Sequence, residues 1–229
     1  MEGQGIDEVR APVDAHAAEA GKITRGAGVV AFFTSISRVA GLARDLVMSH
    51  LFGATAISDA FNVAFVIPNM MRRFVAEGAL TVSFIPVYTE VRHKQGDDKA
   101  KDFYRATLGL LLILLVLLTL GGVLAARPMV YALASGFAED PQKYELTISL
   151  TRWMFPYIFF VSLVALSMGV LNAHRHFAAP AASPILLNIG MIVCTLGFYH
   201  YFHVSIYAAA LGVLVGGVLQ LLSQMPTLR

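Results

Sequence analysis

Four arginines, Arg38, Arg44, Arg72 and Arg73, lie in segments that are otherwise apolar enough for a membrane. An arginine inside the hydrocarbon costs roughly 2.5–3.5 kcal/mol on insertion scales, so four facing lipid would cost on the order of 10 kcal/mol. That is comparable with the stability of a whole domain. We therefore expect them to face the interior of a helix bundle or a water-filled cavity. A guanidinium in such a place suits pyrophosphate, because it is planar, always charged and bidentate toward phosphate oxygens.

Helical spacing gathers the polar residues of these segments onto one face of each helix, because residues at three- and four-residue steps share a face. The first polar face comprises Thr34, Ser37, Arg38, Gly41, Arg44, Asp45 and Met48. The second comprises Asp59, Asn62, Asn69, Arg73, Ala76 and Glu77, with Arg72 beside it. Only a short connection near Gly53–Thr55 separates the two segments. The pattern predicts a paired hairpin of helices whose polar faces meet at one cavity.

A purely structural interpretation of the same charges stays open. The ion pairs available within the two segments are Arg73 with Glu77, and Arg38 or Arg44 with Asp45 or Asp59. Four arginines stand against three acids, so at least one guanidinium remains for an anion. The residues by themselves favour a polyanionic ligand.

Composition excludes several classes of protein. Of 229 residues, 57% are hydrophobic and 14% charged, whereas soluble domains are about 45–50% apolar and about 25% charged. A soluble enzyme is therefore ruled out, and a net charge of +2 is too small to indicate nucleic acid. Cys194 is the single cysteine, which excludes disulfides and cysteine-based metal sites. No catalytic or nucleotide-binding motif is present, and we expect no metal, no cofactor and no enzymatic activity.

Apolar stretches define the expected architecture, an all-α integral membrane protein. Four uncharged or nearly uncharged stretches are long enough to cross about 30 Å of hydrocarbon, and they are the expected third to sixth spans: Ala106–Ala126, Trp153–Leu171, Phe177–Tyr199 and Val204–Leu222. The arginine-bearing segments Gly26–Phe52 and Ser58–Thr89 are the first two. We thus expect a disordered cytoplasmic tail over residues 1–25 and a six-helix transmembrane bundle over residues 26–229. Gly212 and Gly216 predict a close helix contact.

Basic residues in the loops give the orientation of the six spans. The side that carries both termini has ten Lys and Arg residues, whereas the opposite side has three: Arg127, Lys143 and Arg152. Because basic loops stay in the cytoplasm, both termini are predicted to be cytoplasmic.

A run of short motifs resembles a known family. These are Ser37 through Asp45, Phe52-Gly53-Ala54, Ser58 through Phe61, Pro68 through Arg73, Ala76 through Ala79 and Phe84 through Tyr88. At this order and spacing they resemble the start of the bacterial MurJ/MviN lipid II flippases of the MOP exporter superfamily. Later segments such as Asn172–Phe177 are similar too, so the resemblance covers about residues 28–229.

The resemblance implies a fold of two six-helix lobes around a central cavity in the bacterial cytoplasmic membrane, this chain being the N-terminal lobe. It implies that lipid II, an undecaprenyl-pyrophosphate-linked disaccharide-pentapeptide, moves from the cytoplasmic to the periplasmic leaflet. Arg38, Arg44 and Arg72 match the family's cavity arginines, and Asp59 matches its acidic position on the second helix. Ser37, Arg73 and Glu77 match the motifs with less defined substrate-binding roles.

The second lobe expected from the resemblance does not follow Arg229 in this sequence. The expected partners are therefore lipid II, membrane lipids and a second six-helix lobe, supplied by a longer chain or a separate one. Because alternating access needs two lobes, the chain alone should not transport. Two other functions stay open: half of a multidrug or polysaccharide exporter on the same scaffold, and a non-transporting membrane scaffold in a cell-wall complex.

Overall fold

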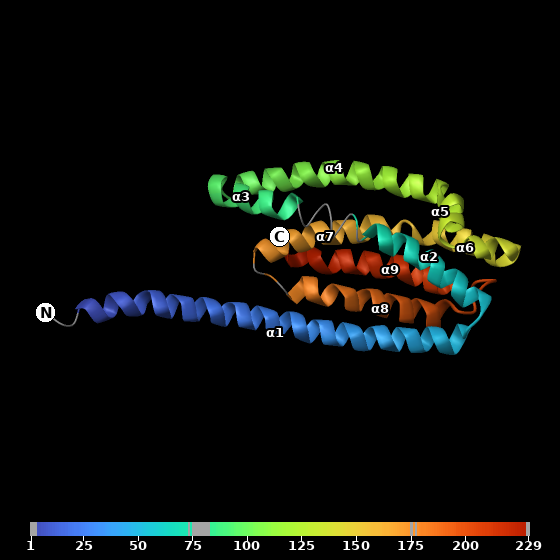
Figure 1. Cartoon of the computed structure of the whole chain (residues 1–229), viewed down its shortest axis with the longest axis horizontal. Helices are drawn as coiled ribbons and strands as arrows, with labels where there is room; N and C mark the ends of the chain where they lie inside the picture. Colours follow the sequence, from blue (N-terminus) through green and yellow to red (C-terminus); the bar gives the residue numbers. More distant parts are fainter. Residues whose placement is uncertain (1–3, 73, 75–82, 175, 177, 228–229) are drawn as a thin grey trace.

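The computed structural model describes residues 4–72, 74, 83–174, 176 and 178–227, and this part of the chain is helical with no strand. Figure 1 shows a bundle of long helices from which the start of the first helix projects. The elements are α1 (Gln4–Phe52), α2 (Ala56–Arg72), α3 (Ile85–Gln95), α4 (Asp97–Leu124), α5 (Ala126–Leu133), the 3-10 turn η2 (Ser135–Glu139), α6 (Pro141–Met154), α7 (Tyr157–Ala173), α8 (Ala178–Phe198), α9 (Ile206–Gln224) and the 3-10 turn η3 (Met225–Thr227).

Four helical segments in the described part of the chain are long and apolar enough to cross a membrane: Asp97–Leu124, Pro141–Ala173, Ala178–Phe198 and Ile206–Gln224. The four plain apolar stretches expected from the sequence fall one in each. The second begins earlier than expected, because α6 leads into α7 through a short turn at Phe155-Pro156. α1 and α2 are not among these four spans, and α2, with 17 residues, is shorter than the 18 that the four spans reach or exceed.

The N-terminal segment differs from the disordered tail expected over residues 1–25. Helix α1 begins at Gln4 and continues to Phe52 without interruption. Alanine has the highest intrinsic helix propensity, and this segment is rich in it, with Ala11, Ala15, Ala17, Ala18 and Ala20. A polar composition indicates exposure to water, but it does not exclude a helix.

Among the described glycines, the closest contacts with the backbone of another helix join α8 to α9. A Cβ built on Gly212 would lie 2.6 Å from the Cα of Met191, and one on Gly190 would lie 2.8 Å from the Cα of Gly216. The close contact expected at Gly212 and Gly216 is therefore confirmed. The two backbones touch where only glycine fits.

The expected α1–α2 hairpin is wrong as a packed pair. α1 lies along α8, whereas α2 packs mainly on α6, so the two helices diverge from their short connection (Figure 1). Gly53 ends α1 with φ +59°, and its N–H donates to the Ser49 carbonyl at 2.9 Å. Thr55 then accepts the N–H of Ser58 at the start of α2. The short loop makes the chain reverse direction, but it does not determine which helix α1 or α2 packs against.

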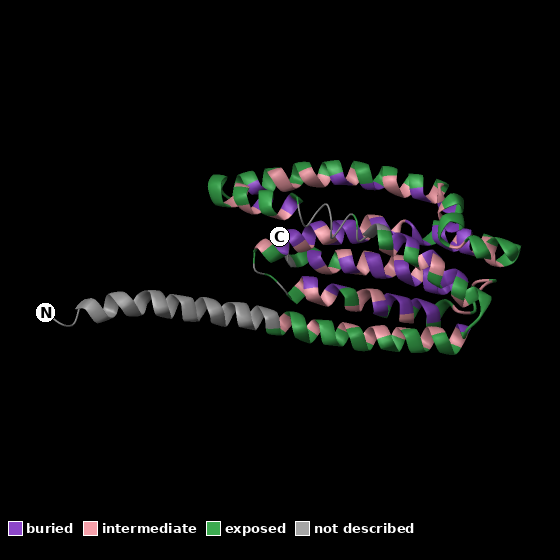
Figure 2. Cartoon of the chain, in the orientation of Figure 1, coloured by how far each residue is buried: buried purple, intermediate pink, exposed green. Residues whose placement is uncertain are grey.

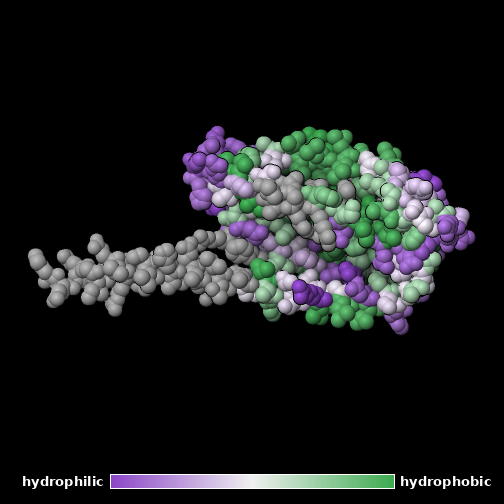
Figure 3. Space-filling model, in the orientation of Figure 1, coloured by the Kyte–Doolittle hydropathy of each residue, from purple (hydrophilic) through white to green (hydrophobic). Residues whose placement is uncertain are grey.

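Burial separates the centre of the bundle from its lipid-like surface. Buried residues concentrate in α6–α9, while α1 and α4 are largely exposed (Figure 2). Beyond Arg105 the outer face of α4 is apolar (Figure 3) and presents Leu110, Ile113, Leu114, Leu117, Leu120 and Leu124. A continuous apolar surface of this kind is typical of contact with membrane hydrocarbon.

Candidate functional site

Arg44 is held between two helices. Its Nε and Nη2 donate to the Asp45 Oδ1 at 3.0 and 2.7 Å, and its Nη1 donates to the Asn188 Oδ1 of α8 at 3.0 Å. The Arg44 side chain is 25% exposed and that of Asp45 is 64% exposed. The Arg44–Asp45 pair, one of the pairs left open from the sequence, is confirmed. Asp45 thus compensates the charge of Arg44, while Asn188 fixes its position.

Asn188 is the residue of this site that sequence reasoning missed. It is only 6% exposed, and while its Oδ1 accepts from Arg44, its Nδ2 donates to the Ser37 carbonyl at 3.3 Å. It therefore bridges two turns of α1. Gly41 lies between them, where a Cβ would be 3.7 Å from the Asn188 Nδ2. The available signal was a lone amide in an apolar span, since such groups bond across membrane helices.

Arg38 has a different environment from Arg44. It lies on the same face of α1 as Asp45, one heptad earlier, and it is exposed. Among the described residues its guanidinium forms no hydrogen bond and no ion pair. Arg38 is therefore available to an anionic ligand. Ser37, its neighbour, is half-buried and contributes its backbone carbonyl to Asn188.

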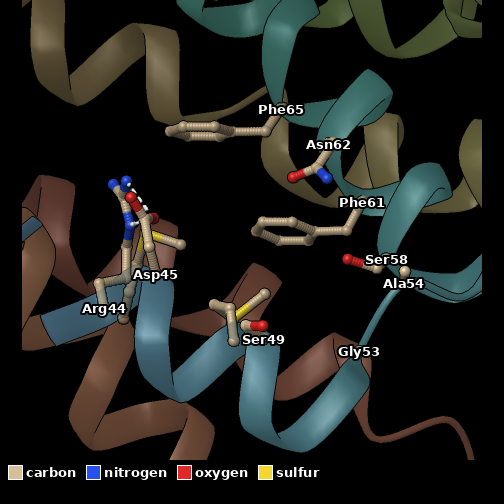
Figure 4. Close-up of a pocket in the computed structure, with 11 residues that line it drawn as sticks. Arg44, Asp45, Ser49, Gly53, Ala54, Ser58, Phe61, Asn62 and Phe65 are labelled. Atoms are coloured by element: carbon tan, nitrogen blue, oxygen red, sulfur yellow. Dashed lines mark hydrogen bonds and ion pairs between the residues drawn. The ribbon is translucent and has the colours of Figure 1, made fainter. Parts of the chain in front are cut away.

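A pocket of about 320 Å³ lies where α1 and α2 diverge. Figure 4 shows the rings of Phe61 and Phe65 projecting from α2 toward Arg44 and Asp45 on α1. The lining residues are Arg44, Asp45, Met48, Ser49, Gly53, Ala54, Ser58, Phe61, Asn62, Phe65 and Met191. Separate packing of the two helices creates this pocket, and of the described residues on the two predicted polar faces only Arg44, Asp45, Met48 and Asn62 line it.

Asp59 is not brought to this pocket. Its Oδ2 accepts from the Lys143 Nζ at 2.7 Å, and the same ammonium lies 3.9 Å from the centroid of the Phe137 ring. Asp140 caps α6 by accepting the N–H groups of Gln142 and Lys143, which fixes Lys143 at the helix start. Asp59 therefore ties the first turn of α2 to α6, and its partner is a lysine that the sequence had not paired with it.

The remaining site residues expected from the sequence lie at the end of α2 or beyond it. Arg72 is the last residue of α2, and the structure gives no description of its side chain. Arg73 and Glu77 lie outside the described residues. Their pairing and their roles stay predictions. Within the described part of the chain no group of three His, Cys, Asp or Glu residues could hold a metal.

Comparison with known proteins decides the family. The family model described as "Lipid II flippase MurJ" matches residues 48–229. This chain belongs to the MurJ family. Together with the four spans, membership indicates a multi-pass protein of the bacterial cytoplasmic membrane.

Individual MurJ relatives agree with the family assignment. The lipid II flippase MurJ of Burkholderia cenocepacia is 44% identical over 200 residues, which are 87% of this chain and 39% of that protein. A probable lipid II flippase MurJ of Bdellovibrio bacteriovorus is 41% identical over 203 residues, 88% of this chain and 39% of that protein. The chain thus spans about two fifths of the length of these MurJ relatives.

A solved structure confirms the similarity of the fold. The structure titled "Lipid II flippase MurJ, inward closed conformation" superposes with a TM-score of 0.74 at 25% sequence identity. It covers 86% of this chain and 41% of the MurJ chain. The described helices therefore have the arrangement found in part of a MurJ transporter.

Proposed function

We propose that this chain is the N-terminal, six-span lobe of a lipid II flippase and that its arginines bind the pyrophosphate of the substrate. Membership of the MurJ family carries the proposal. The geometry adds a guanidinium of suitable chemistry, because Arg38 is exposed on the polar face of α1 without a protein partner among the described residues. Hydrogen bonds from a charged donor such as this are worth about 1.5–3 kcal/mol each.

Each expected site residue has a proposed role. Arg38 and Arg72 contact the pyrophosphate directly, and Arg44 offers the substrate the two N–H groups that Asp45 and Asn188 leave free. Ser37 positions Asn188 through its carbonyl, and Asp59 holds α2 against α6. Arg73 and Glu77, which lie outside the described residues, keep their predicted substrate-binding roles.

The direction of the helices supports an even number of crossings with both termini in the cytoplasm. α4 and α8 run in the same direction as α1, whereas α2, α7 and α9 run in the opposite one (Figure 1). Ten basic residues on the side of the termini agree with this orientation. A second six-helix lobe would close the side of the cavity between α1 and α2, as alternating access requires.

Growth of cells depleted of their own lipid II flippase tests the function. The natural protein that carries this chain should restore growth, and Arg38→Ala should not, at equal amounts in the membrane. An outward-facing substitution on the same helix, Leu46→Ala, is the control, since Leu46 is 63% exposed. If the unaltered protein does not restore growth but makes cells resistant to cationic drugs by exporting them, the chain is half of a multidrug exporter and the flippase proposal is wrong.

Orientation is tested by cysteine labelling in intact cells. With Cys194 replaced by Ala, a membrane-impermeant reagent should reach a cysteine at Gln142 but not one at Lys99 or Arg10. Labelling at position 99 and not at 142 would reverse the orientation.

A further inference from the structure

The pocket between α1 and α2 is electrically balanced, unlike the site at Arg38. Its lining contains one cation, Arg44, and one anion, Asp45, whose atoms are 2.7 Å apart. The Asp45 carboxylate is 64% exposed, so a pyrophosphate in this pocket would lie against a negative charge. Like charges in contact repel each other, and more strongly in a partly enclosed pocket than in bulk water. The pocket therefore favours an uncharged polar ligand over an anion.

Aromatic rings form one wall of the pocket. Phe61 and Phe65 lie nearly parallel, with an angle of 10° between the rings and 6.0 Å between their centroids. Phe61 is buried in the core, whereas Phe65 is half-buried and lies 6.4 Å from the ring of Tyr157. Such a wall offers an apolar surface to a flat ligand with an apolar face.

Polar groups surround the same wall with unused hydrogen-bonding capacity. Within the described part of the chain, the side chains of Ser49, Ser58 and Asn62 have no hydrogen-bond partner. All three line the pocket (Figure 4). Arg44 keeps two free N–H donors, and Asp45 keeps an oxygen that no described residue occupies. Both donors and acceptors therefore line the same pocket as the aromatic rings.

We infer that this pocket binds a sugar ring of the lipid-linked precursor, an inference that rests on the proposed function. A pyranose has C–H groups on its faces for Phe65 and hydroxyl or amide groups at its rim for Asp45, Asn62 and the serines. A volume of about 320 Å³ is near the lower end for small-molecule pockets, which fits one sugar unit and not the whole head group. The pyrophosphate then lies beside Arg38, toward the N-terminal end of α1.

Two lipid probes separate sugar binding from pyrophosphate binding. Binding of lipid II and of undecaprenyl pyrophosphate, which lacks the sugars, is measured by native mass spectrometry with the natural full-length protein in lipid nanodiscs. Phe65→Leu should weaken lipid II binding about three- to tenfold and change undecaprenyl pyrophosphate binding less than about twofold. Arg38→Ala should weaken binding of both probes. Phe32→Leu is the matched control, because Phe32 is 62% exposed on α1 and outside the pocket.

Each outcome decides between the two proposals. Equal loss of both probes in Phe65→Leu, or no loss of either, overturns the sugar site and leaves the flippase proposal standing. If the unaltered protein binds neither probe, the proposed function itself fails. Should Phe65→Leu not fold, Asn62→Ala replaces it, since Asn62 is exposed and its loss removes only hydrogen bonds to the sugar.

Discussion

The helix pairs α8–α9 and α1–α2 are each joined by a short connection, yet one pair is closed and the other open. Gly190, Gly212 and Gly216 bring the α8 and α9 backbones into contact. α1 and α2 instead diverge around a pocket that contains Arg44 and Asp45. Dispersion and close packing hold helices together where side chains are small, because the hydrophobic effect does not distinguish protein from lipid tails. Charged side chains need space and polar partners, so their helices separate.

The largest loss of stability is expected at the α8–α9 contact, where there is no space for an added side chain. Gly212→Ala should destabilise the protein by about 3 kcal/mol, because its Cβ would lie 2.6 Å from the Met191 Cα and backbone cannot move aside as a side chain can. Thermal unfolding in detergent measures this. Gly197→Ala, on the same helix pair with nothing within 4 Å, is the matched control. Equal stability of the two variants would mean that the helices do not touch as described.

Removing the charge of Arg38 should affect function and not stability, whereas removing that of Arg44 should affect both. Arg38→Ala should reduce lipid II binding at least tenfold and abolish complementation, because a charge-assisted bond to phosphate is worth about 1.5–3 kcal/mol. The melting temperature should stay unchanged, since Arg38 has no partner among the described residues. Arg44→Ala should also abolish function but lower stability, because it leaves the buried Asn188 amide oxygen unpaired. Equal melting temperatures for the two variants would contradict this distinction.

Asn188 binds α1 to α8, and we expect this contact to keep α1 apart from α2. Asn188→Ala should destabilise the protein by about 1–3 kcal/mol, since it removes the acceptor of Arg44 and the donor to the Ser37 carbonyl. Cross-linking of cysteines placed at Ser49 and Ser58 should then become faster than in the otherwise unaltered protein, as α1 is freed to approach α2. An unchanged cross-linking rate would show that other contacts fix α1.

Lysine at position 44 separates charge from geometry. Arg44→Lys keeps the positive charge but loses the planar array that reaches both Asp45 and Asn188. We expect activity to fall about threefold to tenfold at matched protein levels, equivalent to roughly one hydrogen bond. Full complementation by the lysine variant would show that charge alone is required at this position.

The smallest effect concerns the link between α2 and α6. A double-mutant cycle on Asp59→Asn and Lys143→Gln should give a coupling energy of about 1 kcal/mol or less, because Asp59 is 56% exposed and exposed pairs contribute little. Unfolding of the four proteins in detergent measures it. A coupling above about 2 kcal/mol would mean that the pair is buried by a further part of the transporter.

The sequence by itself determined which segments are apolar and long enough to cross the membrane, and which charged residues inside such segments are candidates for function. Hydropathy and length located the spans containing α4, α7, α8 and α9, since transfer from water to hydrocarbon depends on local composition. The cost of intramembrane charge identified Arg38 and Arg44 as functional candidates. The family resemblance, carried by motifs at matching spacing, is confirmed by the family model.

Only the tertiary structure decided which side chains from distant parts of the chain contact each other. Periodicity shows which residues share a helix face, but it does not show which helix that face meets. Arg44 and Asn188 are 144 residues apart, and Asp59 and Lys143 are 84 apart, so neither pair has a local signal. Both pairs depend on packing, which placed α1 on α8 and α2 on α6. Within the described part of the chain Arg44 donates to the Asn188 amide whereas Arg38 has no partner, a difference that depends on how α8 packs on α1.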